Sequence, residues 1–418
     1  MTDDSLVHYD VSSSYYEGSK CLLAQFGYNR DKKKGKRQIV YGLMTDNEGR
    51  PISVNVYPGS TSDSKTMEEQ IAKLKKRFGL DEVVLAGDRG MLTQVKIDAI
   101  KAIGGIDWVS ALRSTSIKRL VEQGCIQLSL FDTIDLMEIY SPDYPGERLV
   151  VCRNPYLAQE RQRTRLDLLT ATEKKLSDLA KRVAAGKLVK EGKIGEALGR
   201  IANQFKMAKH FEFTVGEGKF SYRRNEQHIA QEAALDGFYV LRTSVPEEKW
   251  PKEKVVLGYK SLSRVERGFR TLKSIDLKIR PIHHRLEDRV EAHIFLCTLA
   301  YYVEWHLRQK WQSMIFDDEF PVEHVNNSPV LPALRSESAL KKVRTKKRPD
   351  GSIVHSFQTL LSELATIQCN ENWIPAAPEI PPFNQFTKPN KLQQEALEHL
   401  GINVSGMYGR QKKGLRMT

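Results

Sequence analysis

The amino-terminal part of the chain alternates short apolar runs with amphipathic segments. Strands are predicted where apolar and polar residues alternate or where a short run is wholly apolar: residues 6–11, 38–44, 52–57, 82–86 and 108–112. Helices are predicted where apolar residues recur every three or four positions: residues 65–78 and 92–103. The polar cluster Asp46-Asn47-Glu48-Gly49 is typical of a hairpin turn. The order is therefore three antiparallel strands, a helix, a parallel strand, a helix and a strand, which predicts an α/β layer.

The chain from residue 116 to residue 245 is predicted to be an α+β insertion into that layer. Short β-like runs flank a strongly helical stretch, which Ala184-Ala185-Gly186-Lys187 divides into a helical hairpin over 157–183 and 193–209. Its basic residues could lie along DNA, but a solvated helix face is the more ordinary interpretation. The predicted organisation has four parts: 1–115 and 246–315 as the two halves of one α/β domain, 116–245 as the insertion, and 316–418 as a partly flexible extension.

The stretch from residue 259 to residue 273 predicts a further amphipathic helix. Its apolar stripe has the spacing of a core-facing side: Leu262, Val265, Phe269 and Leu272. Beside that stripe, Tyr259, Glu266 and Lys273 lie seven residues apart, so on one helix they would project from nearly the same side. A carboxylate among cations suits a metal ligand whose neighbours hold phosphates. The alternative is a solvated face on which Glu266 pairs with Arg270, four residues on.

Charge favours a polyanionic partner. The chain has 65 Lys and Arg against 52 Asp and Glu, a formal net charge of +13. Nucleic acid is the commonest partner of such a field, although solubility alone also accounts for surface charge. The five cysteines are scattered without the short pairings of a zinc site, which predicts reduced thiols in a cytoplasmic protein. No apolar run approaches the roughly 20 residues of a membrane helix, and the polar start Met1–Ser5 is unlike a signal peptide.

Two aspartates follow apolar runs of the predicted sheet. Asp10 comes at the end of the first predicted strand, and Asp88 follows the strand over 82–86. Open α/β sheets place their chemistry at the carboxyl ends of strands, so the two carboxylates are predicted to be neighbours. Neighbouring carboxylates repel each other, and a divalent cation such as Mg²⁺ relieves that repulsion. The alternatives are a capping role for Asp10 ahead of Ser12-Ser13-Ser14 and a turn role for Asp88 before Gly90.

With Glu266 added, the three acids resemble those of the DDE transposases of bacterial insertion sequences. The group that the chain resembles has its third acid in a Tyr-(2)-Arg-(3)-Glu-(6)-Lys signature. The matching stretches are Tyr-Asp-Val-Ser-Ser-Ser at 9–14, Leu-Ala-Gly-Asp-Arg-Gly-Met at 85–91, and the segment 259–273. This resemblance extends from Asp10 to about Trp311 and implies a ribonuclease H-like fold, a mixed sheet with flanking helices. It also implies metal-binding, catalytic roles for Asp10, Asp88 and Glu266.

The same resemblance implies DNA-phosphate contacts for Tyr259 and Lys273. The signature arginine falls at position 262, where this chain has Leu262; Arg264 is the candidate substitute, and Arg270 is a further candidate phosphate contact. Only nine residues precede Asp10. We therefore expect the chain to lack the amino-terminal DNA-recognition region of this group, as a fragment or a truncated gene copy would.

The chemistry implied by the resemblance is phosphoryl transfer with two Mg²⁺ ions, for which Mn²⁺ can substitute. Asp10 would bridge both ions, and Asp88 and Glu266 would hold one each. Water would nick double-stranded DNA at the element ends, and each freed 3′-hydroxyl would then attack target DNA. The expected partners are element-end and target DNA and, on DNA, a second copy of the chain; the expected location is the cytoplasmic nucleoid. Two alternatives remain open: a structure-specific nuclease of the same fold, and a DNA-binding remnant without catalysis.

Overall fold

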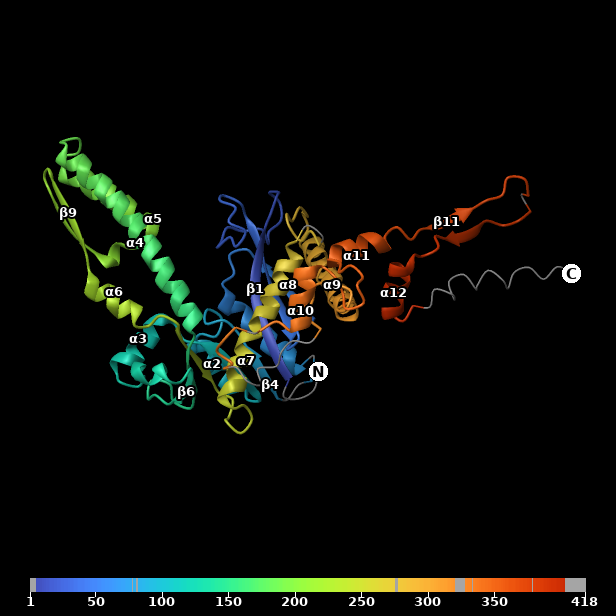
Figure 1. Ribbon diagram of the computed structural model, residues 1–418, viewed down its shortest axis with the longest axis horizontal. Coiled ribbons are helices and arrows are strands. Elements are labelled where there is room, and N and C mark those ends of the chain that lie inside the picture. The colour runs from blue at the N-terminus through green and yellow to red at the C-terminus, as the bar shows by residue number, and fades with distance from the viewer. Residues whose placement is uncertain are drawn as a thin grey trace. The chain divides into compact units, whose positions relative to one another are not determined.

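A computed structural model describes residues 5–402 except 77, 80, 81, 275, 276, 320–327, 333 and 378. In this part of the chain, eight strands form one mixed sheet in the order β3-β2-β1-β4-β5-β10-β7-β6. Figure 1 labels β1, β4 and β6 of this sheet. Its strands are β1 (Ser5–Tyr15), β2 (Gln38–Asp46), β3 (Pro51–Pro58), β4 (Val83–Ala86), β5 (Ile106–Ala111), β6 (Leu136–Ile139), β7 (Arg148–Arg153) and β10 (Phe238–Thr243). Two further antiparallel pairs are β8 (Phe211–Gly216) with β9 (Lys219–Arg224), and β11 (Cys369–Asn372) with β12 (Phe383–Phe386).

The described helices occur between and after these strands. They are α1 (Met67–Lys76), α2 (Gln94–Ile103), α3 (Ser114–Glu122), α4 (Pro155–Ala184), α5 (Glu191–Phe205), α6 (Glu226–Ala233), α7 (Lys252–Lys260), α8 (Leu262–Leu272), α9 (Glu287–Lys310), α10 (Glu337–Thr345), α11 (Phe357–Leu364) and α12 (Lys391–His399). Short 3-10 turns cover Asp63–Thr66, Leu128–Asp132 and Ala208–His210. In the residues that the structure describes, no helix is both long and apolar enough to cross a membrane.

Parallel strands occupy the middle of the sheet. β1 pairs with β4 in parallel from Ser5↔Val83 to His8↔Ala86, and β4 pairs with β5 in parallel. β2 and β3 form the predicted antiparallel hairpin. The predicted order of strands and helices in the amino-terminal part is therefore confirmed, and the sheet with its flanking helices has the predicted ribonuclease H-like α/β architecture.

The first strand is longer than its sequence pattern predicts. The predicted stop at Ser12-Ser13-Ser14 is wrong, because β1 continues to Tyr15 and Asp10 lies inside it. The serines are tolerated in the strand because they are buried and two of them are hydrogen-bonded. Ser14 Oγ lies 2.9 Å from Tyr41 Oη, and Ser13 Oγ accepts a hydrogen bond from Arg30 N at 3.3 Å. Asp10 is therefore a strand residue and not a cap.

The contacts within the chain divide it into two compact units. Unit 1 comprises Met1–Tyr9, Asp63–Leu262 and Asn327–Pro332; unit 2 comprises Asp10–Ser62, Ser263–Asn326 and Ala333–Thr418. The segment predicted to be an insertion, 116–245, lies in unit 1, and its strands β6, β7 and β10 belong to the eight-stranded sheet. The predicted domain boundaries at 115, 245 and 315 stay a prediction.

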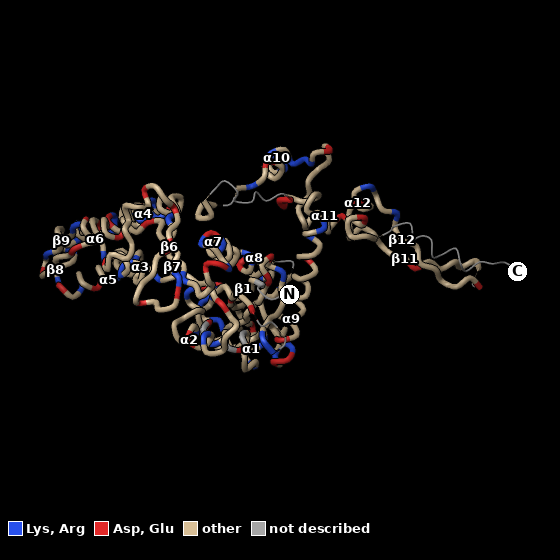
Figure 2. The backbone as a smooth tube through the Cα atoms, turned by 90° about the horizontal axis from the view of Figure 1, so that it is seen from below, with Lys and Arg blue, Asp and Glu red and all other residues tan. Residues whose placement is uncertain are grey.

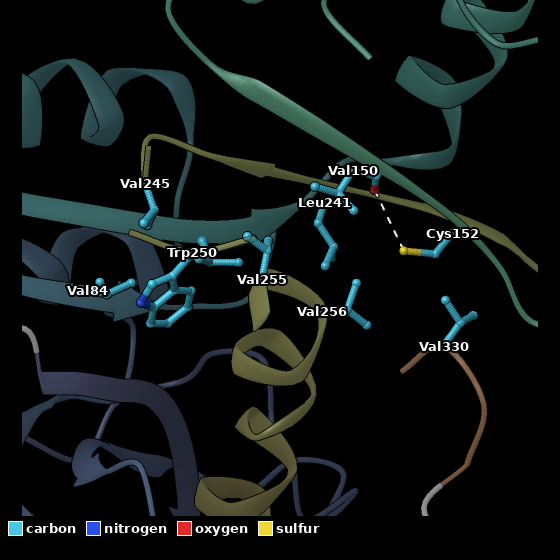
Figure 3. Close-up of a cluster of buried hydrophobic side chains, with 10 residues drawn as sticks. Val84, Val150, Cys152, Leu241, Val245, Trp250, Val255, Val256 and Val330 are labelled. Carbon is cyan, nitrogen blue, oxygen red and sulfur yellow. Dashed lines mark hydrogen bonds between the residues drawn. The ribbon is translucent and has the colours of Figure 1, made fainter. Parts of the chain in front are cut away.

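Unit 1 has an apolar core between strands of the sheet and α7. Figure 3 shows Val84 of β4 and Val255 of α7 beside Trp250, and Val150 of β7 belongs to the same cluster; all four side chains are buried. Removing such side chains from water is the main favourable term in folding. This core holds β4, the strand that precedes the loop carrying Asp88.

The predicted helical hairpin of unit 1 consists of α4 and α5, whose charged positions can be followed in Figure 2. α4 begins after Asn154, whose side chain accepts hydrogen bonds from Tyr156 N and Leu157 N. Pro155 at the first helical position suits that start, because its missing N–H would have no partner there. Leu169 and Leu176 of α4 pack in a small core with Phe211 of β8.

Unit 2 packs α8 and α9 with β2 and β3. The predicted apolar stripe of α8 is buried, and the Phe269 ring lies 5.8 Å from the Tyr41 ring of β2, centroid to centroid. Beyond α9, Trp311 begins a second cluster with Phe357 of α11 and Ala396 of α12. Trp311 Nε1 donates a hydrogen bond to Ala396 O at 2.9 Å. The carboxy-terminal helices α11 and α12 are thus anchored by this tryptophan.

Candidate functional site

Asp88 lies two residues beyond β4, in unit 1. Its backbone is fixed by a turn, since Met91 N and Leu92 N donate to Asp88 O at 2.9 and 3.1 Å. Its Oδ1 accepts a hydrogen bond from Arg89 N at 2.7 Å, and the side chain is exposed. The turn role considered for Asp88 is therefore real, and it leaves the carboxylate facing solvent.

Asp88 also lines a cavity of about 1200 Å³ within unit 1. Tyr259 of α7 lies in the wall of the same cavity, so the structure brings two predicted site residues to one place. The charged lining residues are Arg89, Lys118, Arg161, Arg165, Lys206 and Lys209, against Asp88, Glu160, Glu232 and Asp236. Two of these acids are neutralised locally, by the pairs Arg165–Asp236 (2.5 Å) and Lys209–Glu232. The remaining cations make the cavity attractive to an anion such as a phosphate.

The predicted single helix over 259–273 is wrong, because it is interrupted at Ser261. Tyr259 lies in the last turn of α7 and Glu266 lies on α8. Ser261 Oγ donates to Gly258 O at 2.6 Å and lies 2.6 Å from Nε2 of the buried His8. A serine that bonds nearby backbone competes with helical hydrogen bonding. The seven-residue spacing therefore does not place Tyr259, Glu266 and Lys273 on one side of a continuous helix.

Asp10 lies on β1 in unit 2 and is half-buried. Its Oδ1 accepts a hydrogen bond from Val11 N at 2.7 Å. The last registered pair of β1 and β4 is His8↔Ala86. Asp10 comes two residues after His8, and Asp88 comes two residues after Ala86. A strand alternates its side chains with a period of two, so Asp10 is on the same face of β1 as His8.

Glu266 is exposed on α8, in unit 2. The opposite side of the helix is fixed by packing: Val265 and Phe269 are buried, and a Cβ on Gly268 would come within 3.1 Å of Tyr301 and 3.2 Å of Leu43. Within the described residues, the Glu266 carboxylate has no hydrogen-bond or ion-pair partner, so the alternative pairing with Arg270 is not observed. A carboxylate that has no partner among the described residues is available to an external cation.

Lys273 follows α8 and is held by a buried acid that the sequence does not reveal. Its Nζ donates to Ser13 O at 2.7 Å and to Asp31 Oδ1 at 3.0 Å. Arg280 Nη1 donates to the same Oδ1 at 2.6 Å, and Tyr15 N donates to Asp31 Oδ2 at 3.0 Å. Burial lowers the pKa of Lys273 below its usual range in spite of Asp31. Two of its three N–H donors are used within unit 2, so a DNA phosphate contact would use the third.

The two arginines of α8 differ in their surroundings. Arg264 Nη1 donates to Asn47 O in the β2–β3 turn, where Gly49 closely approaches the Arg264 Cβ. Arg270 is exposed, with its guanidinium free for an external anion in the part of the chain that the structure covers. Arg264 thus helps to position α8 on the hairpin, whereas the guanidinium of Arg270 has no partner among the described residues and can donate to an external anion.

Sequence reasoning missed Asp31, His8 and Ser261. Asp31 is a single acid among the basic residues 30–37, a setting in which an acid is usually solvated. His8 and Ser261 are separated by 253 residues, so no local pattern could link them. In the described residues, no group of three or more His, Cys, Asp or Glu side chains is arranged to hold a metal ion. The donor chemistry of Asp10, Asp88 and Glu266 nevertheless suits a hard divalent cation, because carboxylate oxygens are its preferred ligands.

The fold defines a ribonuclease H-like α/β protein. A family model described as a transposase DDE domain matches residues 3–303, which is most of the chain. The chain therefore belongs to the family of proteins with a transposase DDE domain. Membership implies a transposase function with DNA as substrate, in a family that generally uses divalent metal ions. No curated protein matched the chain.

Proposed function

We propose that this protein is a Mg²⁺-dependent DNA transposase in which Asp10, Asp88 and Glu266 are the metal-binding acids. The observation that carries this assignment is the parallel register of β1 and β4. In this register Asp10 and Asp88 each follow the last pair, His8↔Ala86, by two residues on their own segments. Glu266 is exposed and has no partner in the described part of the chain, which supports its role as the third acid. Mn²⁺ is expected to replace Mg²⁺, since both accept carboxylate and water oxygens.

The bound ions would activate the attacking oxygen and stabilise the leaving oxygen of the phosphodiester. Around them, the chain positions DNA. Arg89 and Lys118 in the cavity beside Asp88 can neutralise backbone phosphates, and the Tyr259 hydroxyl in its wall can donate to a phosphate oxygen. Lys273, Arg264 and Arg270 are the further candidates for phosphate contact on and after α8.

Two successive displacements account for transposition at one site. In the first, water attacks the phosphorus at an element end, the bond to the 3′ oxygen breaks, and a 3′-hydroxyl is freed. In the second, this hydroxyl attacks a phosphorus of target DNA and loses its proton as the new P–O bond forms, while the bond from that phosphorus to the 3′ oxygen of the target strand breaks and the departing oxygen takes up a proton. Only the nucleophile changes between the steps, so the same acids serve both. The proposed setting is the nucleoid of a cytoplasm, with double-stranded DNA as partner.

The test uses a plasmid that carries the gene of this protein with its flanking genomic DNA. Purified protein and Mg²⁺ should give nicks at fixed positions in the flanks, followed by joined products in a second plasmid. Asp10→Asn, Asp88→Asn and Glu266→Gln should each reduce both products by more than roughly 100-fold, since each removes a metal ligand. Asp98→Asn is the matched control, because Asp98 is an exposed acid of α2 whose side chain bonds only to Gln94 in the described structure.

Three results would contradict the proposal in different ways. Nicks without joined products would identify a nuclease of the same fold. Equal activity of Glu266→Gln and Asp98→Asn would show that Glu266 is not a metal ligand. Calorimetry that detects no Mg²⁺ or Mn²⁺ uptake, together with DNA binding, would identify a DNA-binding protein without catalysis.

A further inference from the structure

α9 (Glu287–Lys310) carries apolar side chains on two opposite faces. One face is buried in unit 2: Val290, Ile294, Cys297 and Tyr301. The other face is exposed, with exposed fractions between 39% and 60%: Phe295, Leu296, Leu299, Tyr302 and Val303. A helix that is apolar all round is normally buried all round. An exposed apolar stripe of this length is typical of an interaction surface.

The exposed stripe has the spacing of a helix-pairing seam. Leu299 lies three residues after Leu296 and four before Val303. It also lies four residues after Phe295 and three before Tyr302. Between residues 292 and 303 the helix contains no Asp, Glu, Lys or Arg. Charged residues resume at Glu291 before the stripe and at Glu304 after it, so the stripe is bounded along the helix axis.

We propose that this face binds the same face of a second copy of the chain, with the two α9 helices antiparallel about Leu299. In this register Phe295 faces Val303, Leu296 faces Tyr302, and Leu299 faces its counterpart. Every pair along the centre is therefore apolar. The two-fold axis makes each contact occur twice, as in any isologous dimer.

Charge complementarity at the helix ends favours this antiparallel self-pairing. The register places the exposed Asp288, in the first turn, opposite the exposed Lys310, in the last turn, at both ends of the pair. Arg308 is already paired with Glu304 at 2.8 Å, so Lys310 is the cation available for this contact. A parallel pair would instead place Asp288 beside Asp288. Antiparallel helix dipoles add a small favourable contribution.

The test is sedimentation velocity of the full chain without DNA, over a range of protein concentrations. The wild type should associate to a dimer. Leu299→Arg, which places two like charges on the two-fold axis, should weaken association by more than roughly 100-fold. Leu166→Arg, at a leucine of α4 that is at least as exposed as Leu299, is the matched control and should leave association unchanged. All of these positions are exposed, so far-UV circular dichroism should show the same fold.

Charge exchange tests the register itself. Asp288→Lys and Lys310→Glu should each weaken the dimer by roughly tenfold, because each creates like-charge contacts twice. The double variant Asp288→Lys/Lys310→Glu should return to within about threefold of wild type, because it restores both pairs. A monomeric wild type, an unaffected Leu299→Arg dimer, or a double variant no better than either single one would overturn the proposal. These outcomes do not depend on DNA chemistry, so they are separate from a failure of the proposed transposase activity.

Discussion

Asp31 provides the sharpest test of how α8 is attached to β1. Its side chain is 1% exposed and accepts hydrogen bonds from Lys273, Arg280 and Tyr15 N. Lys273 also donates to Ser13 O, three residues beyond Asp10 on β1. The Asp31→Asn substitution keeps the volume but removes the charge that compensates two cations. We expect it to destabilise unit 2 and to loosen the segment that follows the Glu266 helix.

The magnitude follows from the exposure of the two cations. Removing one member of a buried ion pair costs about 3–5 kcal/mol, because the remaining charge is left uncompensated. Lys273 is 13% exposed and approaches that limit, but Arg280 is 37% exposed and can regain water. Lys273 also keeps its hydrogen bond to Ser13 O. We therefore expect a loss of about 2–3 kcal/mol in the free energy of unfolding.

Urea-induced unfolding monitored by circular dichroism measures this loss. The control is Glu17→Gln, which removes a surface pair with Lys36 (3.6 Å, side chains 43% and 48% exposed) and should change stability by less than about 0.5 kcal/mol. The double variant Asp31→Asn/Lys273→Gln should lose less than the sum of its single variants, since the two side chains are coupled. Additive losses, or an Asp31→Asn loss no larger than that of Glu17→Gln, would refute the reasoning.

Two further predictions concern the hairpin and the cavity. Gly49→Ala should lower the free energy of unfolding in urea by about 1 kcal/mol more than Gly35→Ala. Both glycines have positive φ, but a Cβ at Gly49 would lie 2.9 Å from Arg264, whereas a Cβ at Gly35 would meet no atom within 4 Å. Equal losses of stability would contradict this prediction. Burial lowers the pKa of His210 below its usual range although Glu232 Oε2 lies 2.7 Å from its Nε2. The unfolded chain therefore takes up a proton that the folded chain does not, so the free energy of unfolding should fall as the pH drops through about 6.5, and fall less in His210→Gln.

Elements with a strong local pattern could be predicted from the sequence. Patterns only a few residues long predict β4, the hairpin of β2 and β3, and the helical hairpin α4–α5. This works because hydrophobic period and turn chemistry are local properties of the sequence. The continuation of β1 through its serines could not be predicted. Those serines are stabilised by Tyr41 and Arg30, which are distant in sequence.

The candidate site likewise has a part that the sequence predicts and a part that it does not. Strand ends, a helical period and a family resemblance predict Asp10, Asp88 and Glu266 as site residues, and the family match over residues 3–303 bears out the resemblance to DDE transposases. The idea that Tyr259, Glu266 and Lys273 share one helix side failed at Ser261, whose hydroxyl bonds to Gly258 and to His8. Helical spacing predicts a common side only where the helix is unbroken.

The sequence by itself determined the class of this protein: the order of its elements, its positive charge, and the acids and cations from which a DNA-processing site can be built. Tertiary structure decided which of those cations are already engaged, since Lys273 is held by Asp31 and Ser13 while Arg270 is left exposed. It also left a second apolar face of α9 exposed. The physical reason is that burial and pairing depend on residues brought together by folding, and no local pattern of hydrophobicity or charge contains that information.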